Sequence, residues 1–124
     1  MTFFTAGRFR QSFKYAFRGL AYVARQEQSF RLHIIATILV IALMLYLGVN
    51  LREAVILFMV MTSVLVLELI NTIFESLVDM LQPRIHHLAQ VIKDIMAAAV
   101  FIASIGALII GLLIFIPYLV ERFF

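Results

Sequence analysis

The feature that most constrains this chain is an apolar run that passes without a break into an acidic stripe. Residues 54–67 carry no charge, and the stripe that follows contains Glu68, Asn71, Glu75 and Asp79. At about 100° per residue these four side chains fall within an arc of about 80° on one helix. Carboxyl groups at membrane depth are costly and rarely face lipid. The stripe is therefore expected to meet protein, water or a ligand.

A solvated acidic face at a cytoplasmic helix end is the alternative interpretation of this stripe. It suits Asp79 well. It fits Glu68 poorly, because apolar residues precede Glu68 for more than three helical turns. We therefore interpret the stripe as the functional site.

The composition excludes an ordinary soluble domain. The chain has 124 residues, of which 65% are hydrophobic and 14% charged, and its mean hydropathy is +1.09. These values indicate one small integral membrane unit, spanning residues 1–124, with no second domain. The absence of cysteine excludes disulfides, thiolate metal sites and a cysteine nucleophile. The first thirty residues are not expected to form a cleavable signal peptide.

Residues 1–30 are expected to lie on the membrane surface as an amphipathic helix, with the helical pattern running over 3–25. Apolar side chains recur there at spacings of three and four, at Phe9, Phe13, Phe17, Leu20 and Ala24. Basic side chains occupy other faces, at Arg8, Arg10, Lys14 and Arg18. This pattern is typical of a helix at an anionic membrane surface. No nucleic-acid partner is expected, because the opposite face is rich in phenylalanine.

Three segments are expected to form membrane helices in an all-α protein: 34–51, 54–79 and 96–120. The first carries no charge and is about 27 Å long as a helix, close to the thickness of the bilayer core. The second should project beyond the hydrocarbon and end at Gln82-Pro83, because proline cannot continue the hydrogen-bond ladder. Residues 84–95 should form a short polar segment before the third.

The basic residues predict the orientation of the chain. Six Lys and Arg precede the first apolar segment and two lie in 80–94, whereas the 50–53 turn and the C-terminal tail have one each. This distribution, eight basic residues on one side of the membrane against two on the other, places the N-terminus and the second connection in the cytoplasm and the C-terminus outside. Most of the acidic stripe then lies on the side of the membrane where ATP is.

The polar groups collected on that side suit phosphoryl transfer. Glu27 and the stripe face Lys93 and Asp94 across the proline turn. Carboxylates without cysteine suit Mg²⁺, which commonly takes one or two carboxylates plus substrate phosphates. A lysine can meet phosphate oxygens as a point charge. Phosphoryl transfer is mostly positioning and charge neutralisation. No Gly-rich phosphate loop is present, which excludes a P-loop or protein-kinase site.

The spacing of these residues resembles the prokaryotic diacylglycerol kinase family, which includes the undecaprenol kinases of Gram-positive bacteria. The resemblance is carried by Glu68-x-x-Asn71-Thr72-x-x-Glu75-x-x-Val78-Asp79, His86-x-Leu88-Ala89 and Lys93-Asp94. The N-terminal segments Lys14-Tyr15-Ala16-Phe17-Arg18-Gly19-Leu20 and Glu27-x-x-Phe30-Arg31-x-His33 also fit the family pattern. The resemblance covers nearly the whole chain.

The resemblance implies a homotrimer in the bacterial cytoplasmic (inner) membrane, with active sites shared between subunits. It implies transfer of the γ-phosphate of ATP to a membrane lipid alcohol, with Mg²⁺ as cofactor. Glu68 is then the general base, and Glu27 and Glu75 are the metal ligands. The implied nucleotide contacts are Arg8, Tyr15, Glu27, Glu75, Arg84, His86, Lys93 and Asp94. The implied lipid contacts are Phe30, Arg31, Glu68 and Ala97, with Asn71 and Asp79 supporting the site.

Some positions depart from the family pattern, and two questions stay open. The departures are Gln90, Ile92, Met96 and Ala98, which surround the start of the third apolar segment and remove no catalytic group. The lipid is either diacylglycerol or undecaprenol, and the stretch from Phe30 to His33 slightly favours undecaprenol. The alternative function is a small proton-coupled transporter with Glu68 as its cation and proton site. A fourth apolar segment, which such transporters need, is missing.

Overall fold

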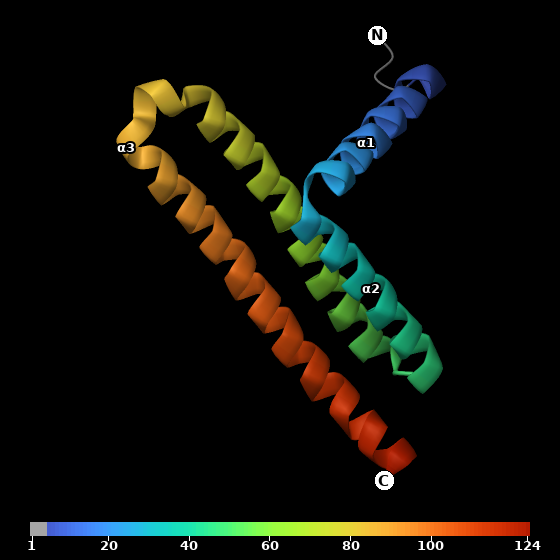
Figure 1. Cartoon of the computed structure of the whole chain (residues 1–124). Coiled ribbons are helices and arrows are strands. Elements are labelled where there is room, and N and C mark those ends of the chain that lie inside the picture. Colours follow the sequence, from blue (N-terminus) through green and yellow to red (C-terminus); the bar gives the residue numbers. More distant parts are fainter. Residues whose placement is uncertain (1–4) are drawn as a thin grey trace.

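The computed structural model describes residues 5–124, which contain helices and no strand. The helices are α1 (Ala6–Gln26), α2 (Gln28–Leu47) and α3 (Leu51–Phe123). The 73-residue α3 changes direction at Ile85, whose backbone is non-helical (φ −118°, ψ 29°). Figure 1 shows the resulting hairpin, whose two limbs we call the first arm (51–84) and the second arm (86–123).

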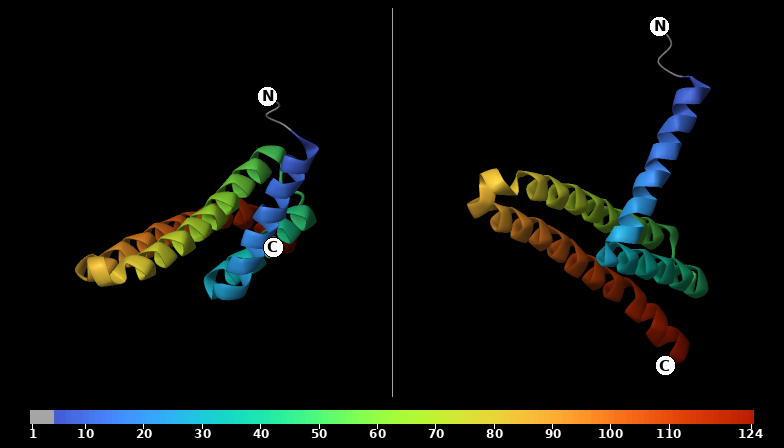
Figure 2. Two further views of the ribbon diagram at one scale, coloured as in Figure 1. Left: turned by 90° about the horizontal axis from the view of Figure 1, so that it is seen from above. Right: turned by 45° about the horizontal axis from the view of Figure 1, so that its top comes forward.

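Helix α1 begins and ends where its sequence supplies a cap and a break. The Thr5 hydroxyl accepts a hydrogen bond from the backbone N–H of Arg8 at 3.1 Å, which satisfies one free donor of the first turn. At the other end Glu27 is extended (φ −113°, ψ 114°), so the chain turns sharply into α2. Helix α1 therefore points away from the other helices (Figures 1 and 2). Residues 3 and 4 of the expected helix lie outside the described residues.

The turn between α2 and the first arm is as tight as its sequence predicts. Gly48 ends α2 in the left-handed conformation (φ 65°), which glycine adopts without steric cost. The side chain of Asn50 then caps α3 by accepting from the Glu53 N–H at 2.9 Å. Helix α2 starts six residues before the expected 34 and ends four before the expected 51. Helix α2 starts early because the break in helical conformation lies at Glu27, so residues 28–33, which precede the apolar segment, are also helical.

The bend of α3 lies two residues beyond the position predicted from proline. The helix continues through Pro83 and changes direction only at Ile85. Proline removes its own N–H from the ladder and its ring crowds the carbonyl of Asp79 four residues earlier, so the helix is weakened here and changes direction within two residues. Residues 86–95, expected to be a separate polar segment, are helical and belong to the second arm. That arm therefore starts well before the expected residue 96.

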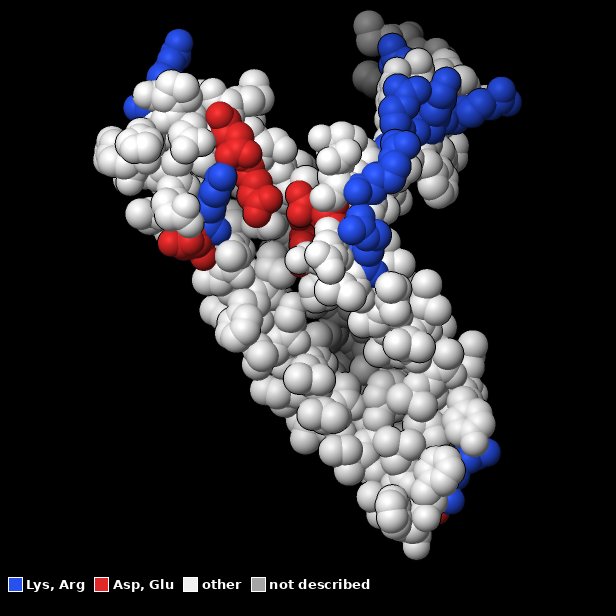
Figure 3. All heavy atoms as spheres, viewed as in Figure 1, with Lys and Arg blue, Asp and Glu red and all other residues white. Residues whose placement is uncertain are grey.

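Little of the apolar surface is buried within one chain. The buried apolar residues of the described chain are Val23, Phe30, Leu57, Val64, Val78, Ala89 and Phe115. Large side chains on the outer faces are open, among them Leu45 (79% exposed), Leu51 (80%) and Leu113 (70%). Helices α2 and α3 are both long and apolar enough to cross a membrane. Figure 3 shows a middle region without charged side chains, which is consistent with an all-α membrane protein.

Candidate functional site

The acidic stripe lies on the first arm and grows more exposed towards the bend. Glu68 is only 3% exposed, Asn71 and Glu75 are half-buried, and Asp79 is exposed. Figure 3 shows acidic side chains gathered between the bend of α3 and the junction of α1 with α2. The stripe thus joins the apolar interior to the polar end of the molecule, with one carboxyl at its deep end.

The buried carboxyl is held by a histidine from the neighbouring helix. The Nε2 atom of His33, on α2, lies 3.1 Å from Oε1 of Glu68. One turn away from each residue, a threonine hydroxyl donates to its backbone carbonyl: Thr37 to His33 at 2.7 Å and Thr72 to Glu68 at 3.0 Å. Glu68 is therefore buried and also partnered, as a buried carboxyl must be.

Two other carboxyls, Glu27 and Glu75, lie close enough to repel each other. Burial raises the pKa of Glu27 above its ordinary value, and the negative charge of Glu75 raises it further. Asn71 donates its amide N–H to Oε1 of Glu75 at 3.3 Å. The other polar atom of that amide, Oδ1, is buried and has no hydrogen-bond partner within residues 5–124. This corner therefore presents several oxygen acceptors and a repulsion that a cation would relieve.

The bend brings a lysine from the second arm onto the exposed end of the stripe. Nζ of Lys93 lies 2.6 Å from Oδ1 of Asp79. This hydrogen bond raises the pKa of Lys93 above its ordinary value, and the charges of Asp79 and Glu75 act in the same direction. Lys93 is therefore a firm positive charge beside the acids. On the next turn, the Gln90 amide donates to Oδ1 of Asp94 at 2.8 Å.

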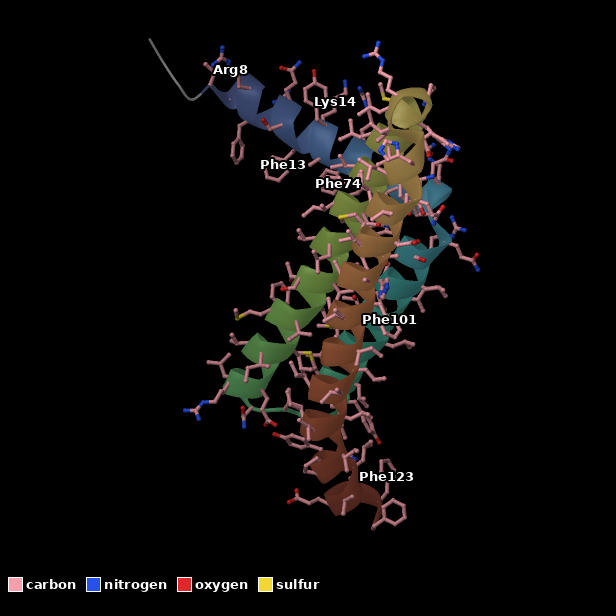
Figure 4. All side chains as sticks on the ribbon, turned by 90° about the vertical axis from the view of Figure 1, so that its left-hand side faces the viewer. Arg8, Phe13, Lys14, Phe74, Phe101 and Phe123 are labelled. Atoms are coloured by element: carbon pink, nitrogen blue, oxygen red, sulfur yellow. The ribbon has the colours of Figure 1, made fainter. Side chains whose placement is uncertain are left out.

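The predicted contacts on α1 and at the bend lie apart from this cluster. Arg8 and Tyr15 are exposed on α1, and the Tyr15 hydroxyl accepts from Gln11 at 3.2 Å. Figure 4 shows Arg8 and Lys14 on one side of α1 and Phe13 on the other, as an amphipathic helix requires. Arg84 and His86 are exposed on either side of the bend.

Three predicted lipid contacts have other surroundings within the single chain. Phe30 is 2% exposed and packs in the core. The Arg31 guanidinium donates from Nη1 to the carbonyls of Ala24 (2.8 Å) and Arg25 (3.0 Å), and so caps the end of α1. Ala97 is exposed on the second arm. Their contacts with lipid stay a prediction.

A sequence profile described as prokaryotic diacylglycerol kinase matches residues 14–115, which include the stripe, its histidine partner and the bend. The chain belongs to the prokaryotic diacylglycerol kinase family. It is therefore an enzyme of the lipid kinase class. The comparisons give no support to the transporter alternative.

Relatives within this family carry two different names. The undecaprenol kinase of Bacillus subtilis is 38% identical over 112 residues, covering 90% of this chain and 91% of that protein. The diacylglycerol kinase of Synechocystis is 34% identical over 89% of this chain, which spans only 63% of that protein's length. The diacylglycerol kinase of Escherichia coli is 32% identical over 77% of this chain and 78% of its own length.

The residue of this lipid kinase that sequence reasoning missed is His33. The sequence places it in the motif Glu27-x-x-Phe30-Arg31-x-His33 but predicts no role for it in the site. A signal was present in the sequence. His33 stands at the head of a charge-free apolar segment, and a tight turn makes that segment run antiparallel to the one containing Glu68. A histidine and a carboxyl at matching depth on antiparallel helices are candidates for a pair.

Proposed function

We propose that this chain transfers the γ-phosphate of ATP, with Mg²⁺, to the hydroxyl of a membrane lipid alcohol. The observation that carries the proposal is Glu68, which is 3% exposed at the deep end of a stripe whose upper end is polar. ATP cannot easily reach that depth, whereas the head of a lipid can. The stripe therefore offers a place for each substrate, about two helical turns apart along one helix.

The proposed transfer needs one residue to accept the proton of the lipid hydroxyl. Glu68 accepts the proton of the lipid hydroxyl as the lipid oxygen bonds to the γ-phosphorus, and the bond from that phosphorus to the bridging oxygen of ADP breaks. The products are the phosphorylated lipid and ADP, and the proton leaves Glu68 afterwards. A buried carboxylate aimed at the hydroxyl suits this task. The rest is positioning and charge neutralisation.

The residues at the shallow end fit a Mg²⁺ site completed by the nucleotide. Residues 5–124 contain no group of three or more acidic or histidine side chains close enough to hold a metal alone. The pair of Glu27 and Glu75 supplies two carboxylates, the usual protein share of a Mg²⁺–nucleotide site. When bound, Mg²⁺ neutralises charge on the phosphates. Glu27 and Glu75 hold and orient it, and the buried Oδ1 of Asn71 offers a further acceptor.

We assign the remaining nucleotide contacts to residues on α1 and on both sides of the bend. Lys93, fixed by Asp79, can meet a phosphate oxygen as a point charge. Arg84, His86 and Asp94 stand near the bend at the same end of the molecule. Arg8 and Tyr15 are exposed on α1, which points away from the acidic stripe of the same chain. We assign these two residues to the nucleotide as well.

We propose a homotrimer in a bacterial cytoplasmic membrane, with three membrane helices per chain. Helix α2 and the two arms of α3 form these helices, α1 lies on the surface, the N-terminus is cytoplasmic and the C-terminus is outside. The apolar outer faces of one chain need lipid or other subunits to cover them. Neighbouring subunits would also enclose the half-buried acids, which gives composite sites.

The favoured lipid is undecaprenol. The relative with that name matches 91% of its own length at 38% identity, whereas the Escherichia coli diacylglycerol kinase matches 78% at 32%. The test is ATP turnover by the purified chain in micelles containing either undecaprenol or a diacylglycerol, with and without Mg²⁺. We expect Mg²⁺-dependent phosphorylation of a lipid, faster with undecaprenol. An absence of lipid-dependent turnover with either alcohol would overturn the proposal.

Shared sites predict rescue between inactive variants. Subunits carrying Glu68→Gln are expected to be inactive alone, and subunits carrying Glu27→Gln to be nearly inactive alone at a Mg²⁺ concentration that only just saturates the wild type. If the base and the metal ligand of one site come from different chains, mixed oligomers contain intact sites and regain part of the activity. The measurement is turnover after co-reconstitution, with mixing verified by two affinity tags. Verified mixed oligomers without activity would contradict shared sites.

A further inference from the structure

We propose that His33 is a positioning residue for Glu68, holding one oxygen of the carboxylate so that the other faces the lipid hydroxyl. This inference rests on the proposed lipid kinase function and on the assignment of Glu68 as base. It assigns a role in the transfer to a residue on α2, outside the acidic stripe.

The contact between the two residues defines which atom does what. A carboxylate can only accept hydrogen bonds, so the proton in the 3.1 Å contact belongs to Nε2 of His33. That holds whether the imidazole is neutral or charged. With Oε1 engaged, Oε2 of Glu68 is left to accept the proton of the substrate. A single donor on one oxygen thus divides the carboxylate into a fixed atom and a working atom.

The pair is mounted on rigid elements. His33 lies on α2 three residues after the core residue Phe30, which is 2% exposed, and Glu68 lies within the first arm of α3. The threonine one turn from each residue donates to its backbone carbonyl. Side chains on packed helices hold a geometry more precisely than side chains on loops. The carboxylate is therefore fixed by a partner that is itself fixed.

The charges around Glu68 explain why a donor is needed at this point. Glu68 lies in the electrostatic range of His33, Glu27 and Glu75, and His33 is the one of these that can donate. Without His33, the Glu68 carboxyl, which is 3% exposed, would have no side-chain hydrogen-bond donor among residues 5–124. It would still lie near the negative charges of Glu27 and Glu75. Such a group turns away from its position or takes up a proton, and in both cases it stops working as a base.

A cavity beside His33 dictates which substitutions are informative. It has a volume of about 270 Å³ and lies between α2 and both arms, lined by His33, Thr37 and largely apolar side chains. Shortening His33 to alanine would enlarge this cavity, so loss of activity would have two explanations. Leucine fills the space without a donor, whereas glutamine can place an amide N–H close to the position of Nε2. Ser104→Ala is the matched control, since Ser104 lines the same cavity from the second arm of α3 and its hydroxyl has no hydrogen-bond partner within residues 5–124.

The first experiment is kinetic. In the Mg²⁺-dependent lipid kinase assay, His33→Leu should lower kcat by up to about 100-fold, the cost of misplacing a reacting group by roughly 1 Å. The KM for ATP should stay nearly unchanged, because the nucleotide end of the stripe is untouched. His33→Gln should recover most of the lost rate, and Ser104→Ala should match the wild type. A fully active His33→Leu enzyme would overturn the proposal, as would a rate for His33→Gln no better than that for His33→Leu.

The second experiment is spectroscopic and does not depend on turnover. In protein labelled with ¹⁵N-histidine, the His33 signals are identified by their absence from the spectrum of His33→Gln. Glu68→Gln should shift the Nε2 resonance of His33, and Ser104→Ala should leave it in place. No shift on Glu68→Gln would show that the contact is absent and would overturn the proposal. A wild-type chain without lipid kinase activity would instead overturn the proposed function, which distinguishes the two failures.

Discussion

The two polar ends of the molecule use similar residues in opposite ways. At the end formed by the turn after α2 and by the C-terminus, the polar groups pair with one another. The Tyr118 hydroxyl donates to Oε1 of Glu53 at 2.5 Å and accepts from the N–H of Asn50 at 3.3 Å. The guanidinium of Arg122 lies over the Tyr46 ring, 4.4 Å from its centre. These contacts tie the second arm to the turn and close the bundle.

At the other end, acids of like charge face each other instead. Within residues 5–124, neither Glu27 nor Glu75 forms an ion pair, and the guanidinium of Arg31, four residues after Glu27, donates to backbone carbonyls instead. The amide oxygen of Asn71 stays buried without a partner. Such an arrangement costs stability in the free protein. It becomes favourable when a ligand supplies positive charge. The first end therefore stabilises the fold, and the second is the end to which we assign the substrates.

The largest expected effect follows from replacing the buried acid of the substrate-binding end. Glu68→Gln should lower the rate of lipid phosphorylation by about 10² to 10⁴-fold, the usual contribution of a general base. Affinity for a non-hydrolysable ATP analogue should be nearly unchanged, because we place the nucleotide about two helical turns away from Glu68. Glu53→Gln, at the closed end, is the matched control and should keep its rate. Normal turnover by Glu68→Gln would show that Glu68 is not the base.

A smaller but sharper effect is expected from the facing acids. Glu27→Gln and Glu75→Gln should each raise the Mg²⁺ concentration needed for half-maximal rate by about tenfold or more. Loss of a residue that only hydrogen-bonds to a metal ligand already lowers metal affinity by about 10- to 100-fold, and loss of a ligand should cost at least as much. The double variant should be hardly worse than either single one, because one site is lost in each case. Titrating Mg²⁺ at fixed ATP checks this. Small effects that add would indicate two independent ion pairs rather than one metal site.

The smallest expected effect is a pH dependence of stability. The raised pKa of Glu27 means that, above its ordinary value of 4.5, the unfolded chain binds fewer protons at this group than the folded chain. Stability contributed by Glu27 is therefore lost as the pH rises through that window. Without Mg²⁺, Glu27→Gln should gain Tm relative to the wild type between acidic and neutral pH. A constant difference in Tm would mean that Glu27 is not strained by its surroundings.

The sequence predicted the features that depend on one helix or one local break. The run of apolar residues into the stripe, the tight turn at Gly48 and the approach of Lys93 to Asp79 across the bend all follow from helical periodicity and from glycine and proline. The bend lies two residues beyond the predicted position, at Ile85, because proline weakens the helix around it without fixing which neighbouring residue becomes non-helical.

Features that depend on the relative depth of two helices were not predicted. The contact of His33 with Glu68 needs α2 to begin at Gln28, six residues before its apolar segment, and this start is set by the extended conformation of Glu27. The carbonyls that bind Arg31 become available only because α1 ends there. Local patterns do not encode such offsets, since they arise from packing between segments.

The contrast between the two ends is tested most directly by the change in Tm when Mg²⁺ and a non-hydrolysable ATP analogue are added at neutral pH. The wild type and Tyr118→Phe should be stabilised to the same extent, although Tyr118→Phe starts from a lower Tm because a tie at the closed end is lost. Glu27→Gln should start from an equal or higher Tm and gain little from the ligand. A ligand-induced rise in Tm that is unchanged in Glu27→Gln, or abolished in Tyr118→Phe, would contradict the assignment of the facing acids to ligand binding.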